Sequence, residues 1–238
     1  MDGRPPGGAN VSVVRAGIIL AGGEGHRLGP GAPKAMRAFG GTTLLERALA
    51  LLSARCERVF VSVPHAFPLP PDTLRYERVD DLSNGEGPLA GLVPALERAA
   101  TARADLAWVI PTDMPLLGPA QLDALLFALD PPDGPFSQLS VVPPAAIVPR
   151  TLRGIDPLVG IYRPVYAAPI LRSAWSKGER SPARALLDLG GRIRYLDVEK
   201  DGVWPGGIET LGGVNTPEEW DRALARTKEL ERRALESS

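Results

Sequence analysis

The chain has 238 residues, 44% of them hydrophobic and 23% charged, which is enough for one large α/β domain or two small ones. Its formal net charge is −1, so no global basic field points to nucleic acid, and an anionic ligand would need a local site. The sequence has one cysteine, Cys56, no apolar stretch of membrane-spanning length and no signal peptide, and we therefore expect a soluble cytoplasmic protein.

The first half of the chain alternates between strand-like and helix-like patterns. Residues 1–12 are rich in Pro and Gly and are expected to form a disordered tail, followed by a single domain over residues 13–238. Helical stripes of apolar residues separate short apolar runs, a pattern typical of βαβ units and a mostly parallel sheet. The expected strands are Val13–Leu20, Arg58–Val63, Arg75–Val79 and Asp105–Pro111.

The second half is less regular. Ala145–Arg150 and Pro157–Arg163 are expected to pair as strands, with a helix after them. Ser181 followed by Pro182 is typical of a helix start, and a long amphipathic helix is predicted from Pro217. We find no internal repeat, and the whole chain is expected to form an α/β fold.

The first strand leads into a glycine-rich loop, LAGGEGHRLG, over residues 20–29. It is not a P-loop, because Lys34 is followed by Ala35, and it is not a dinucleotide fingerprint, because Leu28 stands where glycine is needed. Small residues nevertheless let backbone N–H groups approach an anion, and Arg27 and Lys34 add positive charge. The loop is therefore a candidate phosphate site, and the alternative is a mobile turn whose basic side chains face solvent.

Carboxylates follow two further strands. Asp113, in PTDMP, comes directly after the strand that ends at Pro111 and is a candidate Mg²⁺ ligand. Asp80 and Asp81 come after the third strand, before a helix that begins near Pro88. Because the carboxyl ends of parallel strands share one edge, we expect these residues beside the glycine loop. Ordinary turn chemistry is the alternative for both segments.

A basic segment, KGERSPAR, lies beside the predicted helix start at Ser181. Its Arg180 is a candidate contact for a second anion, such as a phosphorylated acceptor. The alternative is a solvated loop. His26 and His65 lack metal-ligand spacing, and we identify no pattern for nucleophilic catalysis.

Five segments together resemble the molybdenum cofactor guanylyltransferase family of small-molecule nucleotidyltransferases. They are LAGGEGHRLG with PKAM, then GPLAGL, PTDMPLL, PLVGIYR and VNTPEEW, and they extend in that family's order from Ile18 to Trp220. The resemblance implies a three-layer Rossmann-like nucleotidyltransferase fold. It also implies a Mg²⁺-dependent reaction in which GMP from GTP is transferred to molybdopterin with release of pyrophosphate.

The resemblance also implies roles for individual residues. The nucleotide would be contacted by Leu20, Ala21, Gly22, Gly23 and Asp81, with Asp80 as the alternative to Asp81. Arg27 and Lys34 would contact its phosphates and act catalytically, and Asp113 would bind Mg²⁺. Asn215 would lie near the acceptor.

Three departures from the family pattern keep the base and the acceptor open. Lys34 follows Pro33 after one extra residue, as in sugar-phosphate and methylerythritol-phosphate nucleotidyltransferases. Pro64 stands near the place where the family often has an asparagine after the second strand. Gly213 stands where the family often has an asparagine before Val-Asn-Thr-Pro. The alternatives are transfer from CTP, transfer to a sugar phosphate, or a nucleotide-binding regulator without turnover. The sequence leaves the oligomeric state undetermined.

Overall fold

A computed structural model describes residues 13–23, 25–70, 76–129, 143–200 and 202–236. The predicted tail, residues 1–12, lies outside the described residues. The described strands of the main sheet are β1 (Arg15–Leu20), β4 (Arg58–Val63), β5 (Glu77–Asp80), β6 (Leu106–Pro111), β7 (Ala146–Thr151), β8 (Gly154–Ile155), β9 (Gly160–Tyr162) and β10 (Ile193–Asp197). The described helices are α1 (Leu44–Ser53), α2 (Leu89–Thr101), α3 (Pro119–Leu129), α4 (Pro164–Ser176), α5 (Pro182–Leu187) and α6 (Pro217–Glu236).

The sheet is mixed but mostly parallel, in the order β10-β7-β9-β6-β1-β4-β5, with β8 paired to β7. β1 lies between β4 and β6 and runs parallel to both, whereas β9 runs antiparallel to β6 and β7. The predicted pairing of the two segments in the second half is therefore confirmed. A short hairpin, β2 (Ala38–Phe39) with β3 (Thr42–Thr43), was not predicted from the sequence.

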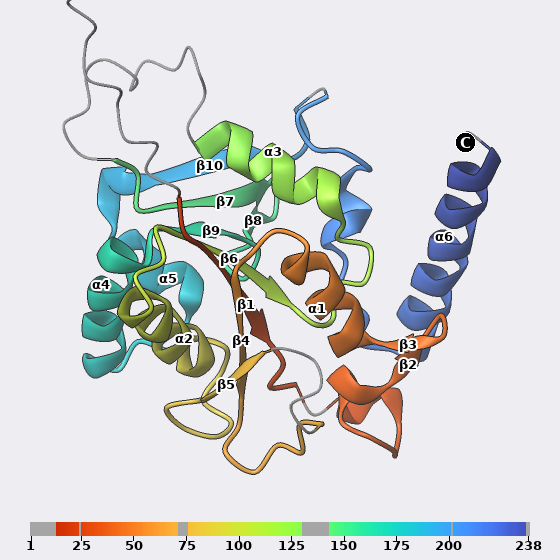
Figure 1. Cartoon of the computed structure of the whole chain (residues 1–238), viewed down its shortest axis with the longest axis horizontal. Helices are drawn as coiled ribbons and strands as arrows, with labels where there is room; N and C mark the ends of the chain where they lie inside the picture. Colours follow the sequence, from red (N-terminus) through yellow and green to blue (C-terminus); the bar gives the residue numbers. More distant parts are fainter. Residues whose placement is uncertain (1–12, 24, 71–75, 130–142, 201, 237–238) are drawn as a thin grey trace, which may run out of the picture.

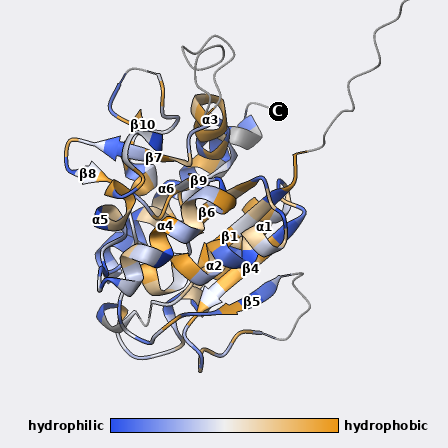
Figure 2. Ribbon diagram, turned by 90° about the vertical axis from the view of Figure 1, so that its left-hand side faces the viewer, coloured by the Kyte–Doolittle hydropathy of each residue, from blue (hydrophilic) through white to orange (hydrophobic). Residues whose placement is uncertain are grey.

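Helices cover both faces of the sheet, which gives three layers (Figure 1). In β1, Ile18 packs in the core under α2, α4 and α5, and the next residue, Ile19, packs in the core under α1 and α3. Successive side chains of a strand point to opposite faces, so a strand covered on both sides is apolar throughout. Figure 2 shows this hydrophobic character on the central strands. The predicted α/β class is confirmed.

The strand order turns at β1, because the chain continues to β4 and β5 on one side and to β6 on the other. Leu20 at the end of β1 pairs in register with Ser62 of β4 and with Pro111 of β6. In an open α/β sheet this edge forms a crevice where ligands bind. The loops after β1, β4, β5 and β6 therefore meet at one place.

Helix α6 begins beside that edge and extends away from the sheet (Figure 1). Its start is a capping box: the Thr216 hydroxyl accepts from the Glu219 N–H, and the Glu219 carboxylate accepts from the Thr216 N–H. Trp220 packs edge-on against Phe39 with ring centroids 5.3 Å apart. The described helices include none with the length and apolar character needed to cross a membrane.

Gly160 of β9 has no space for a side chain. A Cβ atom there would lie 2.5 Å from the Ile147 carbonyl oxygen of the neighbouring strand β7. We expect Gly160→Ala to lower the free energy of unfolding by about 2–3 kcal/mol, because the backbone of β9 or of its neighbour β7 would have to shift. Urea denaturation measures this change. The matched control is Gly191→Ala, where a Cβ meets nothing within 4 Å; equal losses in both variants would contradict the expectation.

Candidate active site

Two adjoining cavities open at the carboxyl edge of β1, β4, β5 and β6. The smaller, of about 340 Å³, is lined by residues of the loops after β1, β5 and β6 and by the start of α2. The larger, of about 850 Å³, lies between the segment 22–37 and the segment 64–68. Gly22, Gly23, Lys34 and Asp113 line both cavities. The two cavities therefore form one continuous cleft, narrow at the sheet and wider outside.

A buried lysine stands where the cavities join. The Lys34 ammonium donates to Asp113 Oδ2 at 2.7 Å and to Asn215 Oδ1 at 2.8 Å. Lys34 is 5% exposed, so water screens this charge only weakly. Three segments far apart in the sequence thus converge on one cation: the turn after the glycine loop, the loop after β6, and the residues before α6.

The glycine loop supplies the wall beside this lysine. Gly25 has φ +70°, and a Cβ there would lie 2.8 Å from Lys34 Cβ, so the close approach requires glycine. Arg27 is exposed and lines the larger cavity. Leu20 lines the smaller cavity, whereas the Ala21 side chain packs in the core. A ligand would therefore meet Ala21 through its main chain.

The opposite wall carries a half-buried carboxylate. Asp81 Oδ1 accepts from the Ser62 hydroxyl at 2.7 Å, and Asp81 lines the smaller cavity. Burial raises the pKa of Asp81, and the nearby charge of Asp80 adds to the effect. Gly91 of α2 makes room, since a Cβ there would lie 2.8 Å from both Asp81 Oδ1 and Ser62 Oγ.

The neighbouring Asp80 lines neither cavity of the cleft. It accepts from Arg78 Nε at 2.7 Å and lies 3.1 Å from His65 Nδ1. The hydrogen bond from Arg78 lowers the pKa of Asp80, with a further contribution from His65. Of the two aspartates that the sequence left open, the structure therefore brings Asp81 to the cleft.

Arg180 does not line either cavity. Its guanidinium stacks on Trp175, donates to Glu86 at 2.6 Å and donates to the carbonyls of Trp175 and Glu179. These contacts join the loop before α2 to the loop before α5. The position of Arg180 thus gives no support to its predicted contact with an acceptor.

Sequence reasoning did not identify Ser62, Gly91 or Thr112 as members of the site, nor Asp156 as a charged neighbour of Asp113. Ser62 is a polar residue in the otherwise apolar part of β4, a signal that could have been used. Asp156, before β9, has its pKa raised by burial and also by the charge of Asp113. Its proximity to Asp113 depends on the antiparallel insertion of β9, which local patterns do not reveal.

The oxygen atoms at Lys34 are suited to a hard cation. Asp113 offers a carboxylate and Asn215 an amide oxygen, both already directed at one positive charge. Mg²⁺ commonly takes one or two carboxylates and completes its shell with phosphate oxygens and water. In the part of the chain that the structure describes, no cluster of three or more His, Cys, Asp or Glu side chains could hold a metal by itself. The residues fit Mg²⁺ that is bound together with a phosphate ligand.

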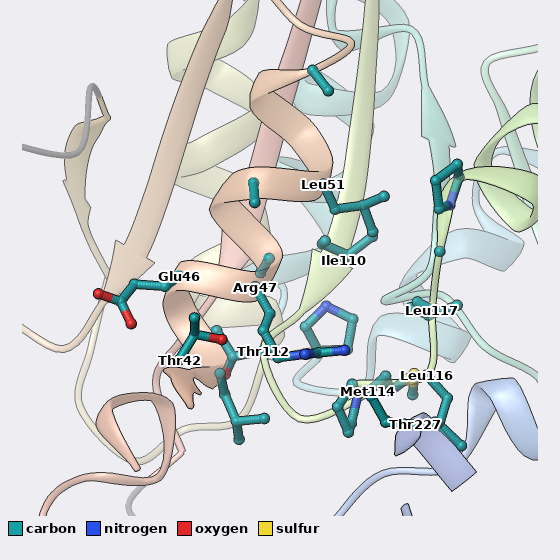
Figure 3. A pocket seen from close by; sticks show the side chains of 18 of the residues that line it. Thr42, Glu46, Arg47, Leu51, Ile110, Thr112, Met114, Leu116, Leu117 and Thr227 are labelled. Atoms are coloured by element: carbon teal, nitrogen blue, oxygen red, sulfur yellow. The ribbon is translucent and has the colours of Figure 1, made fainter. Parts of the chain in front are cut away.

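A third cavity, of about 550 Å³ and mainly apolar, lies between α1, the loop after β6 and α6 (Figure 3). Its lining includes residues of α1, residues 110–112 and 114–119, and Thr227 and Leu230 of α6. Thr112 borders both this cavity and the smaller one of the cleft. Thr112 therefore lies between the cleft and this mainly apolar cavity.

The chain is similar to members of a known protein family. Residues 17–192 match the model of the family described as the MobA-like NTP transferase domain. A protein of Pseudomonas syringae named "Molybdenum cofactor guanylyltransferase" is 33% identical over 208 residues, which is 84% of this chain and 88% of that protein. A "Probable molybdenum cofactor guanylyltransferase" of Mycolicibacterium paratuberculosis is 41% identical over 115 residues, 48% of this chain. That match spans 57% of the mycobacterial protein's length, and so less than two thirds of it.

Among solved structures, molybdopterin-guanine dinucleotide biosynthesis protein A of Archaeoglobus fulgidus is similar with a TM-score of 0.67. The sequences are 24% identical, and the match covers 90% of this chain and 99% of that chain. At this identity the likeness shows a common fold. It supports the three-layer architecture that the family resemblance implied.

Replacing Asp81 by asparagine should change how stability depends on pH. Because burial raises the pKa of Asp81 above 3.8, the native state loses stability as the pH rises from that value through the raised pKa. Asp81→Asn keeps an oxygen acceptor for Ser62 and does not titrate. We expect its unfolding free energy, relative to the original chain, to increase between about pH 4 and about pH 7.

Asp80→Asn is the matched control, since the lowered pKa of Asp80 has the opposite consequence. Its stabilising contribution is present above its ordinary pKa of 3.8 and is lost as the pH falls below that value. Asp80→Asn should therefore be less stable than the original chain at about pH 7, and this difference should shrink below about pH 4. Denaturation curves between about pH 2 and about pH 7 measure both variants. The same direction of change in both would contradict the assignment of the buried carboxylate to Asp81.

Proposed function

The chain belongs to the MobA-like NTP transferase domain family, and from that premise we propose that it transfers GMP from GTP to molybdopterin with release of pyrophosphate. The observation that carries the proposal is the convergence of Lys34, Asp113 and Asn215 where the two cavities join. It provides positive charge and oxygen ligands beside a glycine-rich wall. The names of the relatives supply the guanine nucleotide and the molybdopterin acceptor.

In the proposed reaction a phosphate oxygen of the acceptor attacks the α-phosphorus of GTP. The bond from that phosphorus to the oxygen bridging the β-phosphorus breaks, pyrophosphate leaves, and a new phosphoanhydride bond remains. The attacking phosphate carries negative charge at neutral pH, because its second pKa is near 6. The proposed mechanism therefore needs no general base, and the chain contributes alignment and charge neutralisation.

Each side chain then has a defined task. Asp113 would hold Mg²⁺, which when bound polarises phosphate oxygens and offsets their charge. Lys34 would turn from the two oxygens that it contacts in this structure toward the phosphates, and exposed Arg27 would meet the outer phosphates from the larger cavity. The glycine wall at Gly22 and Gly23 would approach the nucleotide through main-chain N–H groups.

The narrow cavity suits the nucleoside. Asp81 presents a carboxylate there, and nucleosides offer ribose hydroxyls and base N–H groups as hydrogen-bond donors. Leu20 supplies an apolar surface at the same level. Asn215 stands at the outer side of the reacting centre, where an acceptor phosphate would enter, and it is the residue proposed to border both metal and acceptor.

The decisive experiment is a matrix of GTP, CTP, ATP and UTP against molybdopterin and several sugar phosphates, with Mg²⁺, read as pyrophosphate release. We expect release with GTP and molybdopterin together. Release with CTP or with a sugar phosphate in their place would replace the base or the acceptor in the proposal. Nucleotide binding without release in any combination would favour a regulator that lacks turnover.

Asp113→Asn should lower kcat/KM for pyrophosphate release by at least about a hundredfold, because a neutral amide oxygen binds Mg²⁺ more weakly than a carboxylate does. The matched control is Asp123→Asn on α3, whose carboxylate forms an exposed ion pair with Arg55. We expect that variant to retain its full rate. An active Asp113→Asn variant with an unchanged response to Mg²⁺ would contradict the metal assignment.

A further inference from the structure

Arg37 makes an unusual set of contacts beside the proposed nucleotide site. Its Nε donates to the Ala32 carbonyl at 3.0 Å and one terminal nitrogen donates to the Leu28 carbonyl at 2.7 Å. The other terminal nitrogen donates to the Gly29 carbonyl. The guanidinium is thus directed at main-chain oxygens of one short segment, residues 28–32.

That segment connects the two proposed phosphate contacts, because Arg27 precedes it and Lys34 follows it. It contains Gly29 with φ +80° and Gly31 with φ +141°. A Cβ at Gly29 would meet nothing within 4 Å, so side-chain packing does not restrain the chain there. Glycines in such conformations lose more freedom on ordering than any other residue.

Arginine is suited to restraining such a segment. Its planar guanidinium carries five donors in a fixed fork, so several carbonyls can be held in one relative geometry. A lysine ammonium is a point charge on a flexible stem and does not impose that geometry. Arg37 itself is anchored by the turn that carries Lys34, since its N–H donates to the Lys34 carbonyl at 3.1 Å.

We infer that Arg37 is a positioning residue that orders residues 28–32 before the nucleotide binds, and so sets the distance between Arg27 and Lys34. This inference rests on the proposed function, because it assigns the ordered segment to the triphosphate. Arg37 also lines the larger cavity. Without the restraint, the ordering of the segment opposes binding each time a triphosphate enters.

Isothermal titration calorimetry with Mg²⁺ and each of GTP and GMP tests this inference. We expect Arg37→Lys to weaken GTP binding by about tenfold, since charge-assisted hydrogen bonds contribute at about this level, with a more unfavourable entropy of binding. GMP binding should change by less than about twofold, because GMP lacks the outer phosphates. In turnover, KM for GTP should rise more than kcat falls, and Arg37→Met should be affected more than Arg37→Lys.

Arg194→Lys is the matched control. Arg194 also donates to main-chain carbonyls, those of Ala128 and Leu129 at the end of α3, and it lines neither cavity of the cleft. This variant should bind GTP as the original chain does. If Arg37→Lys binds GTP normally, or loses GTP and GMP equally, the positioning role is overturned while the proposed function stands. If the original chain binds no nucleoside triphosphate, both are overturned.

Discussion

A buried positive charge organises this end of the molecule. The Lys34 ammonium is paired with Asp113, 79 residues away, and with Asn215, 181 residues away. Removing one partner of a buried ion pair is costly, typically about 3–5 kcal/mol, because the other charge is left without compensation. The glycine loop, the loop after β6 and the start of α6 must therefore assemble together around this one group. The capping box at Thr216 and Glu219 then fixes the backbone of Asn215, whose N–H donates to the Glu219 carboxylate at 2.7 Å.

Glycines around the cleft serve that assembly by keeping space free. At Gly25 a Cβ would press on Lys34, and at Gly91 it would press on Asp81 and Ser62. Both positions let backbone come close to a charged side chain, so the charge stays near the sheet edge. Arginine has the complementary task in the longer loops. Arg37 holds carbonyls of the segment after Arg27, and Arg78 holds carbonyls of Pro64 and Phe67 on the facing wall. The glycines therefore let the walls of the cleft approach each other closely, and the guanidinium groups of Arg37 and Arg78 hold the outer loops in place.

The sequence predicted the architecture better than the contacts. The apolar segment RVFVSV identified Arg58–Val63 as a strand with its observed bounds, and the boundary signal at Ser181 correctly located the start of α5. Weak patterns were less accurate: the third strand was expected at Arg75–Val79, of which Arg75 lies outside the described residues, and the observed strand is Glu77–Asp80. The position of Arg180 could not be read from its charge, because a basic loop residue can face a ligand or, as here, a neighbouring carboxylate. The contact of Asn215 with Lys34 depends on the path of the whole second half of the chain.

The charges within the cleft are arranged along its length. Asp81 lies at the narrow end, the Lys34–Asp113 pair lies in the middle, and Arg27 and Arg37 line the wide end. A nucleoside triphosphate has the matching order, with hydrogen-bond donors on base and ribose and with negative charge concentrated at the outer phosphates. A ligand bound in the reverse direction would bring phosphates to Asp81, and like charges in a partly buried site repel strongly. With a net charge of −1, the protein has no global field to impose this direction. Under the proposed function, the order of charged residues along the cleft selects this direction, and Asp81 would then bear on the orientation of the nucleotide as well as on its affinity.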